Sequence, residues 1–185
     1  MSLLIGLLVV IGLVVLIAAF FIASYNKLIK LRNWVKEAWS QIGVQLKRRY
    51  YLMPNLVEAV KGYDAHEKET LEKVIQARNQ LVQGTPQERI EADNQLQTTL
   101  KSIFALSEAY PDLKANQNFL KLQEELTTTE NKVAYSRQLY NKTVAEYNIK
   151  RETFPTVLIA GMLGFKAEEQ LTIPEAEREA PQVSF

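Results

Sequence analysis

The first stretch of the chain is uniformly apolar. Residues 3–23, LLIGLLVVIGLVVLIAAFFIA, contain no charged residue. A helix of this length extends about 30 Å, which matches the hydrocarbon core of a bilayer. The stretch is longer than the apolar region of a signal peptide, and it lacks both a basic start and a clean cleavage site. The pattern therefore favours a retained transmembrane anchor over residues 1–24, contacting the lipid bilayer through residues 3–23, over a cleaved signal.

Beyond the anchor, apolar residues recur at the spacing of a helix face. Steps of three and four join the apolar positions from Leu28 to Leu46 and from Leu56 to Leu81, which is the α-helical period. A glycine, a threonine and a proline at 84–86, with Glu88 three residues after the threonine, form a stop signal followed by a capping box. We find no strand pattern. The fold class is therefore all-α, with packed antiparallel helices joined by short loops.

Pro54 leaves two readings open. It removes a backbone donor and disfavours helical geometry at Met53. The missing glycine before it favours a kink inside one long helix, whereas the equal helix lengths on either side favour a turn between two helices.

The last long helix carries a seven-residue repeat. Phe119, Leu126, Val133, Tyr140, Tyr147 and Phe154 lie seven residues apart, a period that keeps one seam against a partner helix. The second seam is weaker, with leucine, threonine and serine, so a bundle helix is favoured over an autonomous coiled coil.

The run FPTVLIAGMLGF at 154–165 follows this helix. As a helix it would extend only about 18 Å, too short to cross a bilayer. We expect it to fold back as an apolar cap on the bundle, and a shallow membrane contact or a partner site is the alternative. The predicted cap residues are Phe154, Pro155, Leu158, Leu163 and Phe165. Residues 166–185 carry five glutamates and two prolines and are predicted to be a disordered acidic tail.

The charged residues bear on nucleic-acid binding and on membrane orientation. The net charge of +1 gives no general attraction to nucleic acid, so we expect no nucleic-acid partner. Basic residues outnumber acids after the anchor, and the N-terminal side offers only the α-amine. The positive-inside rule then predicts a single-pass protein of the cell membrane, with a cytoplasmic C-terminal domain and the N-terminus outside, although the same charges could simply solvate a helix.

The chain offers little catalytic chemistry. It has no cysteine and a single histidine, His66, which excludes thiol nucleophiles and zinc-thiolate sites. Asp64, Glu67 and Glu69 lie near His66, but a di-iron bundle needs two Glu-x-x-His pairs. No nucleophile elbow or phosphate-binding glycine loop occurs. We therefore expect no catalytic residue, no metal and no cofactor. The basic triplet KRR at 47–49 could touch anionic lipid, although plain solvation is the more common role.

Polar residues are unusually frequent on the predicted bundle helices. They favour an interhelical hydrogen-bond network that sets the helix register, and a polar groove for a partner is the functional alternative. The candidates form one group around Pro54 and another along the last helix: Gln45, Arg48, Arg49, Asn55, Glu58, Glu130, Asn131, Arg137, Asn141 and Asn148.

Two long blocks resemble the LemA family. They are YNKLIKLRNWVKEAWSQIGVQLKRRYYLMPNLVEAVKGYDAHE at 25–67 and ENKVAYSRQLYNKTVAEYN at 130–148, the latter followed by the apolar run. The likeness covers about residues 1–166. It implies a membrane helix followed by an up-and-down four-helix bundle over 25–165, which favours a turn at Pro54. The expected helices are 25–52, 54–83, 86–109 and 112–153, with the cap at 154–165. The chain departs from the family at Gly43 and Tyr51, where an acid is frequent.

These observations favour a membrane-anchored, non-catalytic interaction or scaffold protein with an unidentified protein partner; self-association stays open. The alternative is a lipid-organising or envelope-associated protein that uses the KRR segment and the apolar run. A metal-dependent enzyme around His66 ranks last.

Overall fold

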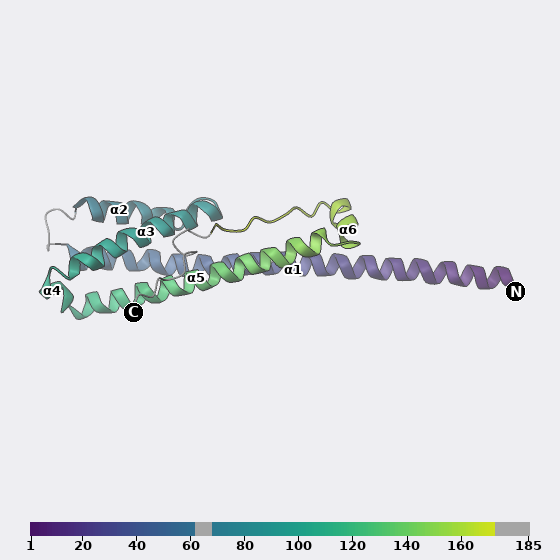
Figure 1. Ribbon diagram of the computed structural model, residues 1–185, viewed down its shortest axis with the longest axis horizontal. Helices are drawn as coiled ribbons and strands as arrows, with labels where there is room; N and C mark the ends of the chain where they lie inside the picture. Colours follow the sequence, from purple (N-terminus) through teal and green to yellow (C-terminus); the bar gives the residue numbers. More distant parts are fainter. Residues whose placement is uncertain (62–67, 173–185) are drawn as a thin grey trace, which may run out of the picture. The chain divides into compact units, whose positions relative to one another are not determined.

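The structure, a computed structural model, describes residues 1–61 and 68–172 (Figure 1). Every regular element within these residues is a helix, which confirms the all-α class. The helices are, in chain order, α1 (Ser2–Val60), α2 (Lys68–Gln80), α3 (Pro86–Ser107), α4 (Pro111–Lys114), α5 (Gln117–Glu152) and α6 (Thr156–Met162).

The apolar stretch forms the first part of α1. By length and composition, α1 is the one helix in the described chain that could cross a membrane, and none of its apolar window is buried. Leucine, isoleucine and valine side chains on all sides of this segment are exposed, as expected for a helix that faces lipid. The expected anchor is therefore compatible with the structure.

The expected turn at Pro54 is wrong, because α1 continues through this residue to Val60. A proline inside a helix leaves the carbonyl four residues earlier without its usual N–H donor. Here that carbonyl belongs to Tyr50, and it accepts a hydrogen bond of 3.1 Å from Nε of Arg78 on α2. The Arg78 guanidinium also lies 3.9 Å from the centre of the Tyr50 ring. A side chain distant in sequence thus replaces the missing backbone donor.

The capping box before α3 is confirmed. The Thr85 amide donates to the Glu88 carboxylate at 2.7 Å, and the Glu88 amide donates back to the Thr85 hydroxyl at 3.3 Å. Hydrogen bonds from the Thr85 backbone and side chain to the carboxylate lower the pKa of Glu88. Gly84 precedes the box with a φ of +88°, a left-handed conformation that favours glycine.

The later helix boundaries differ from the expected ones. The range 112–153 divides into the short α4 and the long α5, because Asn116 caps α5: its Oδ1 accepts from the amides of Asn118 and Phe119. The first five positions of the seven-residue repeat, from Phe119 to Tyr147, are buried as predicted. Phe154 is 75% exposed because α5 ends at Glu152, so its predicted place in the seam is wrong.

The described chain divides into two compact units. The anchor unit comprises Met1–Ala38 and Tyr140–Gln170, and the bundle unit comprises the described residues of Trp39–Leu139 together with Leu171 and Thr172. The core of the bundle unit joins apolar faces of α1, α2, α3 and α5. That core includes Ile42, Leu46, Met53, Leu56, Val74, Leu81, Ile90, Leu96, Leu100, Ile103, Phe119, Leu126 and Val133.

In the anchor unit, α6 and the segment after it lie against α1 and α5 (Figure 1). Thr156, Ile159, Ala160 and Phe165 are buried there. The predicted cap is therefore only partly right: of its five named residues Phe165 alone is buried, Pro155 is half-buried, and Phe154, Leu158 and Leu163 are exposed. The physical reason is that α6 is apolar on both faces and only one face can contact the unit.

Residues 166–172 are also ordered, whereas the sequence predicted disorder from 166. Side chains of α5 bind the backbone of Lys166, Glu168 and Glu169, as described below, and Leu171 is buried. Within the bundle unit, Gln87 donates to the hydroxyl of Thr172 at 2.5 Å. Residues 173–185, the rest of the predicted tail, lie outside the described residues.

Candidate functional site

The bundle unit encloses a charge cluster on three helices. Arg49 of α1 and Asp93 of α3 form an ion pair in which both side chains have no exposed surface. Arg137 of α5 lies on the other side of the carboxylate, with its Nη2 3.9 Å from Oδ2 of Asp93. Its Nη1 donates to the Asn94 side chain at 3.1 Å. Two predicted candidates from separate parts of the sequence, Arg49 and Arg137, therefore meet at one acid.

The cluster holds two positive charges against one negative charge. Removing a charge from water costs several kcal/mol unless an opposite charge and hydrogen bonds compensate. Nε and Nη2 of Arg49 find no hydrogen-bond partner among the described residues, so Asp93 supplies the compensation for Arg49. Because the three ions join α1, α3 and α5, their arrangement is compatible with a network that sets helix register, which stays the favoured prediction for the polar candidates.

Three further predicted candidates lie on the same two helices, α1 and α5. Gln45 is half-buried, and its enclosed side-chain oxygen has no hydrogen bond within the described chain. Glu130 is half-buried and Asn131 is exposed. None of the three is joined to the buried ions by a hydrogen bond or ion pair given by the structure.

The basic triplet at 47–49 does not form a surface patch. Arg49 is buried with Asp93, and Arg48 pairs at 2.5 Å with Glu125 of α5. Lys47 alone keeps an exposed side chain without such a partner among the described residues. Only Arg49 is withdrawn from the surface, because Arg48 stays exposed in its ion pair with Glu125. Lipid binding by the KRR segment therefore stays a prediction, with two surface charges in place of three.

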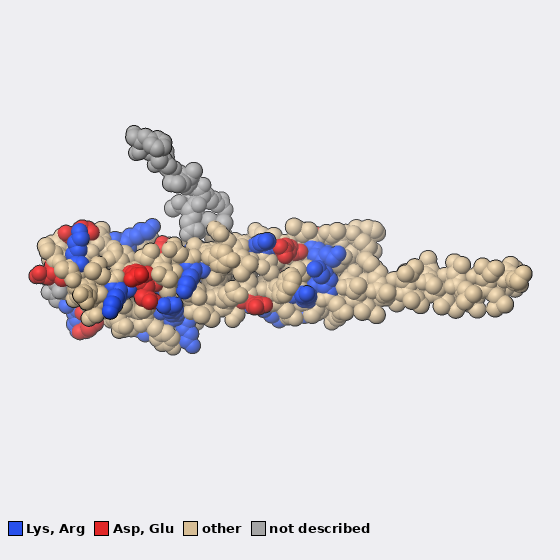
Figure 2. All heavy atoms as spheres, turned by 90° about the horizontal axis from the view of Figure 1, so that it is seen from below, with Lys and Arg blue, Asp and Glu red and all other residues tan. Residues whose placement is uncertain are grey.

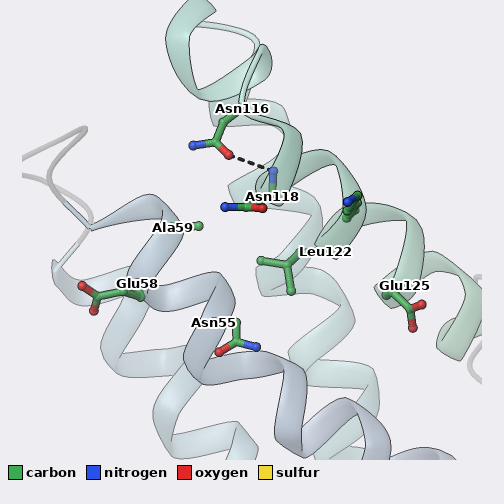
Figure 3. Close-up of a pocket in the computed structure, with 8 residues that line it drawn as sticks. Asn55, Glu58, Ala59, Asn116, Asn118, Leu122 and Glu125 are labelled. Atoms are coloured by element: carbon green, nitrogen blue, oxygen red, sulfur yellow. Dashed lines mark hydrogen bonds between the residues drawn. The ribbon is translucent and has the colours of Figure 1, made fainter.

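A surface pocket of about 470 Å³ lies between the end of α1 and the start of α5. Figure 3 shows Asn55, Glu58 and Ala59 on one wall and Asn116, Asn118, Leu122 and Glu125 on the other. Lys121 also lines it. This pocket brings together two predicted candidates, Asn55 and Glu58, with residues that the sequence did not single out.

The pocket presents hydrogen-bonding groups over a small apolar floor. The oxygen of Asn116 faces the start of α5, so its NH₂ group is turned away from that helix (Figure 3). Asn55 and Asn118 add further amides, and Ala59 and Leu122 supply the apolar contacts. Side-chain amides carry both donors and acceptors, so such a surface can pair with the backbone of a peptide.

In the anchor unit, α5 uses polar side chains to hold the chain after α6. The hydroxyls of Tyr147 and Tyr140 donate to the carbonyls of Lys166 and Glu169, at 2.8 and 3.2 Å. Asn148, a predicted candidate, binds both backbone groups of Glu168: its Nδ2 donates to the carbonyl at 2.8 Å, and its Oδ1 accepts from the amide at 3.1 Å.

The same segment, residues 166–170, makes one more hydrogen bond with α5, and two tyrosines that bind it have raised pKa values. The backbone carbonyl of Asn141 accepts a hydrogen bond from the Gln170 side chain at 3.3 Å. Asn141 and Asn148, the last two predicted candidates, therefore both contact residues 166–170. Burial raises the pKa of Tyr140 and Tyr147, and the negative charge of Glu168 raises both further.

Sequence reasoning missed Asp93, Asn94, Asn116, Asn118 and Glu125. Asp93 carried a usable signal, because it lies three residues after Ile90 and three before Leu96, in the apolar stripe of α3. An acid at a core position of a helix needs a cation from another element. The pocket residues gave no such signal, because exposed asparagines and glutamates are ordinary on a helix surface.

Among residues 1–61 and 68–172, no group of three or more metal-ligating side chains comes together. His66, the centre of the lowest-ranked hypothesis, lies outside the described residues, as do Asp64 and Glu67.

Comparison with known proteins identifies the family. The sequence profile of the LemA family matches residues 38–185. The chain belongs to the LemA family. It is similar to Protein LemA of Metamycoplasma hominis, with 28% identity over 145 residues. That alignment covers 77% of this chain and 66% of the relative, so it spans just under two thirds of the relative's length.

Family membership agrees with the predicted resemblance and with the exposed apolar part of α1. LemA is a membrane-associated family and not a known family of enzymes. The buried ion cluster and the pocket lie inside the matched range of residues.

Proposed function

We propose that this protein is a single-pass, membrane-anchored scaffold that holds a protein partner in the pocket between α1 and α5. The observation that carries the proposal is that one helix, α1, contains both the apolar span and the pocket residues Asn55, Glu58 and Ala59.

The pocket chemistry favours a peptide segment of the partner. Three asparagine side chains surround a floor made by Ala59 and Leu122, which suits a backbone that also inserts one small apolar side chain. Glu58 and Glu125 on the rim are paired with Lys61 and Arg48, so hydrogen bonding and shape, and not net charge, should select the partner segment.

Site-specific photo-crosslinking in cells tests the proposal. A photoreactive residue at Asn118 should give a defined adduct, whereas the same residue at exposed Tyr135, on the same helix, should not. An Asn55→Arg substitution across the pocket should abolish the Asn118 adduct while leaving membrane insertion unchanged. If the Asn118 adduct equals that at Tyr135, or survives Asn55→Arg, the pocket does not hold the partner.

We propose further that the bundle unit faces the cytoplasm. Lys27, Lys30 and Lys36 follow the span, whereas no charged side chain precedes it, and basic residues are retained on the cytoplasmic side. The chain has no cysteine, so Ser2→Cys and Ser184→Cys can be labelled singly with an impermeant reagent in intact cells. Labelling of Ser2→Cys alone is expected, and labelling of Ser184→Cys alone would reverse the topology.

The alternative, a lipid-organising role, loses one of the three charges of the KRR segment because Arg49 is buried. Its second element, the run 154–165, keeps an exposed apolar face. We assign that face to a contact between the protein and the membrane surface, as argued below.

A further inference from the structure

The outer face of α6 is apolar and exposed. Phe154, Leu158 and Met162 are four residues apart, so they share one face of the helix and its approach. They are 75%, 59% and 77% exposed, and Val157 and Leu163 beside them are exposed too. Ala160 and Ile159 on the inner face are buried. A soluble protein rarely leaves such a continuous apolar patch in water.

The structure pins α6 beside the end of the membrane span, within the anchor unit. The ring of Phe165, just after α6, packs edge-on against Tyr25 of α1 with centroids 6.0 Å apart. The Arg32 guanidinium lies 5.3 Å from the centre of the same ring. Tyr25 follows the apolar stretch by two residues, and an aromatic ring there marks the membrane–water boundary.

The return after α6 is also fixed. The Phe165 amide donates to the Ala160 carbonyl at 2.9 Å, and the Gly164 amide donates to the Gly161 carbonyl. Gly164 has a φ of +69°, which completes a glycine-terminated helix end. The outward direction of Leu158 and Met162 is therefore set by the local fold.

Charge locates the same boundary. Residues 1–26 and 153–165 contain no charged side chain, and Lys27 and Lys166 come directly after these two segments. In Figure 2 the narrow extension at one end is drawn without blue or red atoms. Lys27 and Lys30 lie 6.0 and 5.0 Å from the Trp34 ring centre. Apolar residues backed by Trp and Lys are typical of a segment seated at the bilayer interface.

We propose that α6 is an interfacial membrane helix, which inserts Phe154, Leu158 and Met162 into the headgroup and upper acyl region of the leaflet where α1 leaves the bilayer. The ligand of this face is the lipid surface itself. The proposal rests on the membrane anchoring of α1, since α6 is held against its exit by Tyr25 and Phe165. It adds a second, shallow contact that would limit tilting of the anchor unit.

Depth-resolved fluorescence of the full chain in lipid nanodiscs tests the proposal. Single cysteines replace Leu158, Met162, Ile11 and Tyr135 in turn and carry an environment-sensitive dye. Position 11 lies inside the apolar stretch and Tyr135 is an exposed side chain of the bundle unit. Lipids with a nitroxide near the headgroup or deep in the acyl chain serve as quenchers, and iodide quenches from water.

We expect the dyes at 158 and 162 to emit at shorter wavelength than the dye at 135 and to lose most intensity with the shallow nitroxide. The dye at 11 should respond to the deep nitroxide. Iodide quenching at 158 or 162 equal to that at 135 would overturn the proposal. Protection from both lipid and iodide would also overturn it, because a protein would then cover the face.

The dye at position 11 separates the two hypotheses. If it is quenched by deep nitroxide while 158 and 162 are open to iodide, the anchor holds and the α6 proposal fails. If position 11 is itself open to iodide, the anchoring fails. A Leu158→Asp change in the chain labelled at 162 should reduce shallow quenching, whereas Lys142→Asp, at an exposed position of α5, should not.

Discussion

Asp93 offers the sharpest test of how the bundle unit is held together. The Asp93→Asn substitution keeps the shape of the side chain and removes the negative charge that Arg49 and Arg137 share. Both arginines then remain inside the unit and lose the negative charge of Asp93. Removing one partner of a buried ion pair costs about 3–5 kcal/mol. Since a domain is stable by about 5–15 kcal/mol, this loss would be a large fraction of the total.

Arg49→Met provides the matched comparison. It removes the fully buried Arg49, and it leaves Asp93 facing Arg137. The expected loss is about 1–3 kcal/mol, that of a hydrogen bond to a charged group. Asp93→Asn should therefore destabilise the unit more than Arg49→Met does.

Urea unfolding of the full chain in nanodiscs measures both effects. A Trp34→Phe background leaves Trp39 as the reporter, and Trp39 belongs to the bundle unit. With a urea dependence of about 1–3 kcal/mol per molar, Asp93→Asn should lower the unfolding midpoint by about 2 M. A midpoint unchanged by Asp93→Asn, or lowered more by Arg49→Met, would refute the view that one acid compensates two buried cations.

Three further changes test individual contacts. Arg89 Nη2 lies 3.6 Å from the position that a β-carbon at Gly43 would take. Gly43→Ala should stabilise the bundle unit by up to about 1 kcal/mol through helix propensity, and Gly43→Asp should stabilise it more by adding an ion pair with Arg89. Equal unfolding midpoints in urea for the two variants would exclude the new ion pair. Arg78→Met should lower the free energy of unfolding by about 1–3 kcal/mol because it removes the donor to the Tyr50 carbonyl. In a Pro54→Ala background the loss should be smaller, because residue 54 then supplies a backbone N–H. An equal loss with Pro54 and with Ala at position 54 would argue against this account. The pKa of Tyr147 is raised in the folded state. Its hydrogen bond to the Lys166 carbonyl is therefore fully present below about pH 10 and is lost as the pH rises through the folded-state pKa. Protease cleavage after Lys166 should increase over that pH range, and Tyr147→Phe, which already lacks the hydroxyl, should show a smaller increase.

Sequence patterns predicted the structure correctly where it depends only on residues close together in the chain. The apolar stretch at 3–23 determined a candidate membrane helix, because length and hydropathy alone set that property. The capping box at Thr85 and Glu88 formed as predicted, since its two hydrogen bonds join residues three apart. The buried repeat from Phe119 to Tyr147 followed from helical geometry.

Pro54 shows where such patterns stop. By itself this proline is compatible with a turn or with a continuous helix, and the outcome depended on a donor twenty-four residues away, Arg78, reaching the Tyr50 carbonyl. The exposure of Phe154 likewise depended on where α5 ended and on which face of α6 the anchor unit could cover.

The sequence by itself determined the helical class, the candidate anchor and the set of polar residues that the helices would have to accommodate. Only the tertiary structure decided how those residues pair: Arg49 and Arg137 meet at Asp93, Asn148 holds the backbone of Glu168, and Asn55 joins Asn118 around a pocket. The physical reason is that helix formation depends on backbone bonds within a few residues, whereas a buried charge or amide is stabilised by whichever distant group packing brings within hydrogen-bond reach.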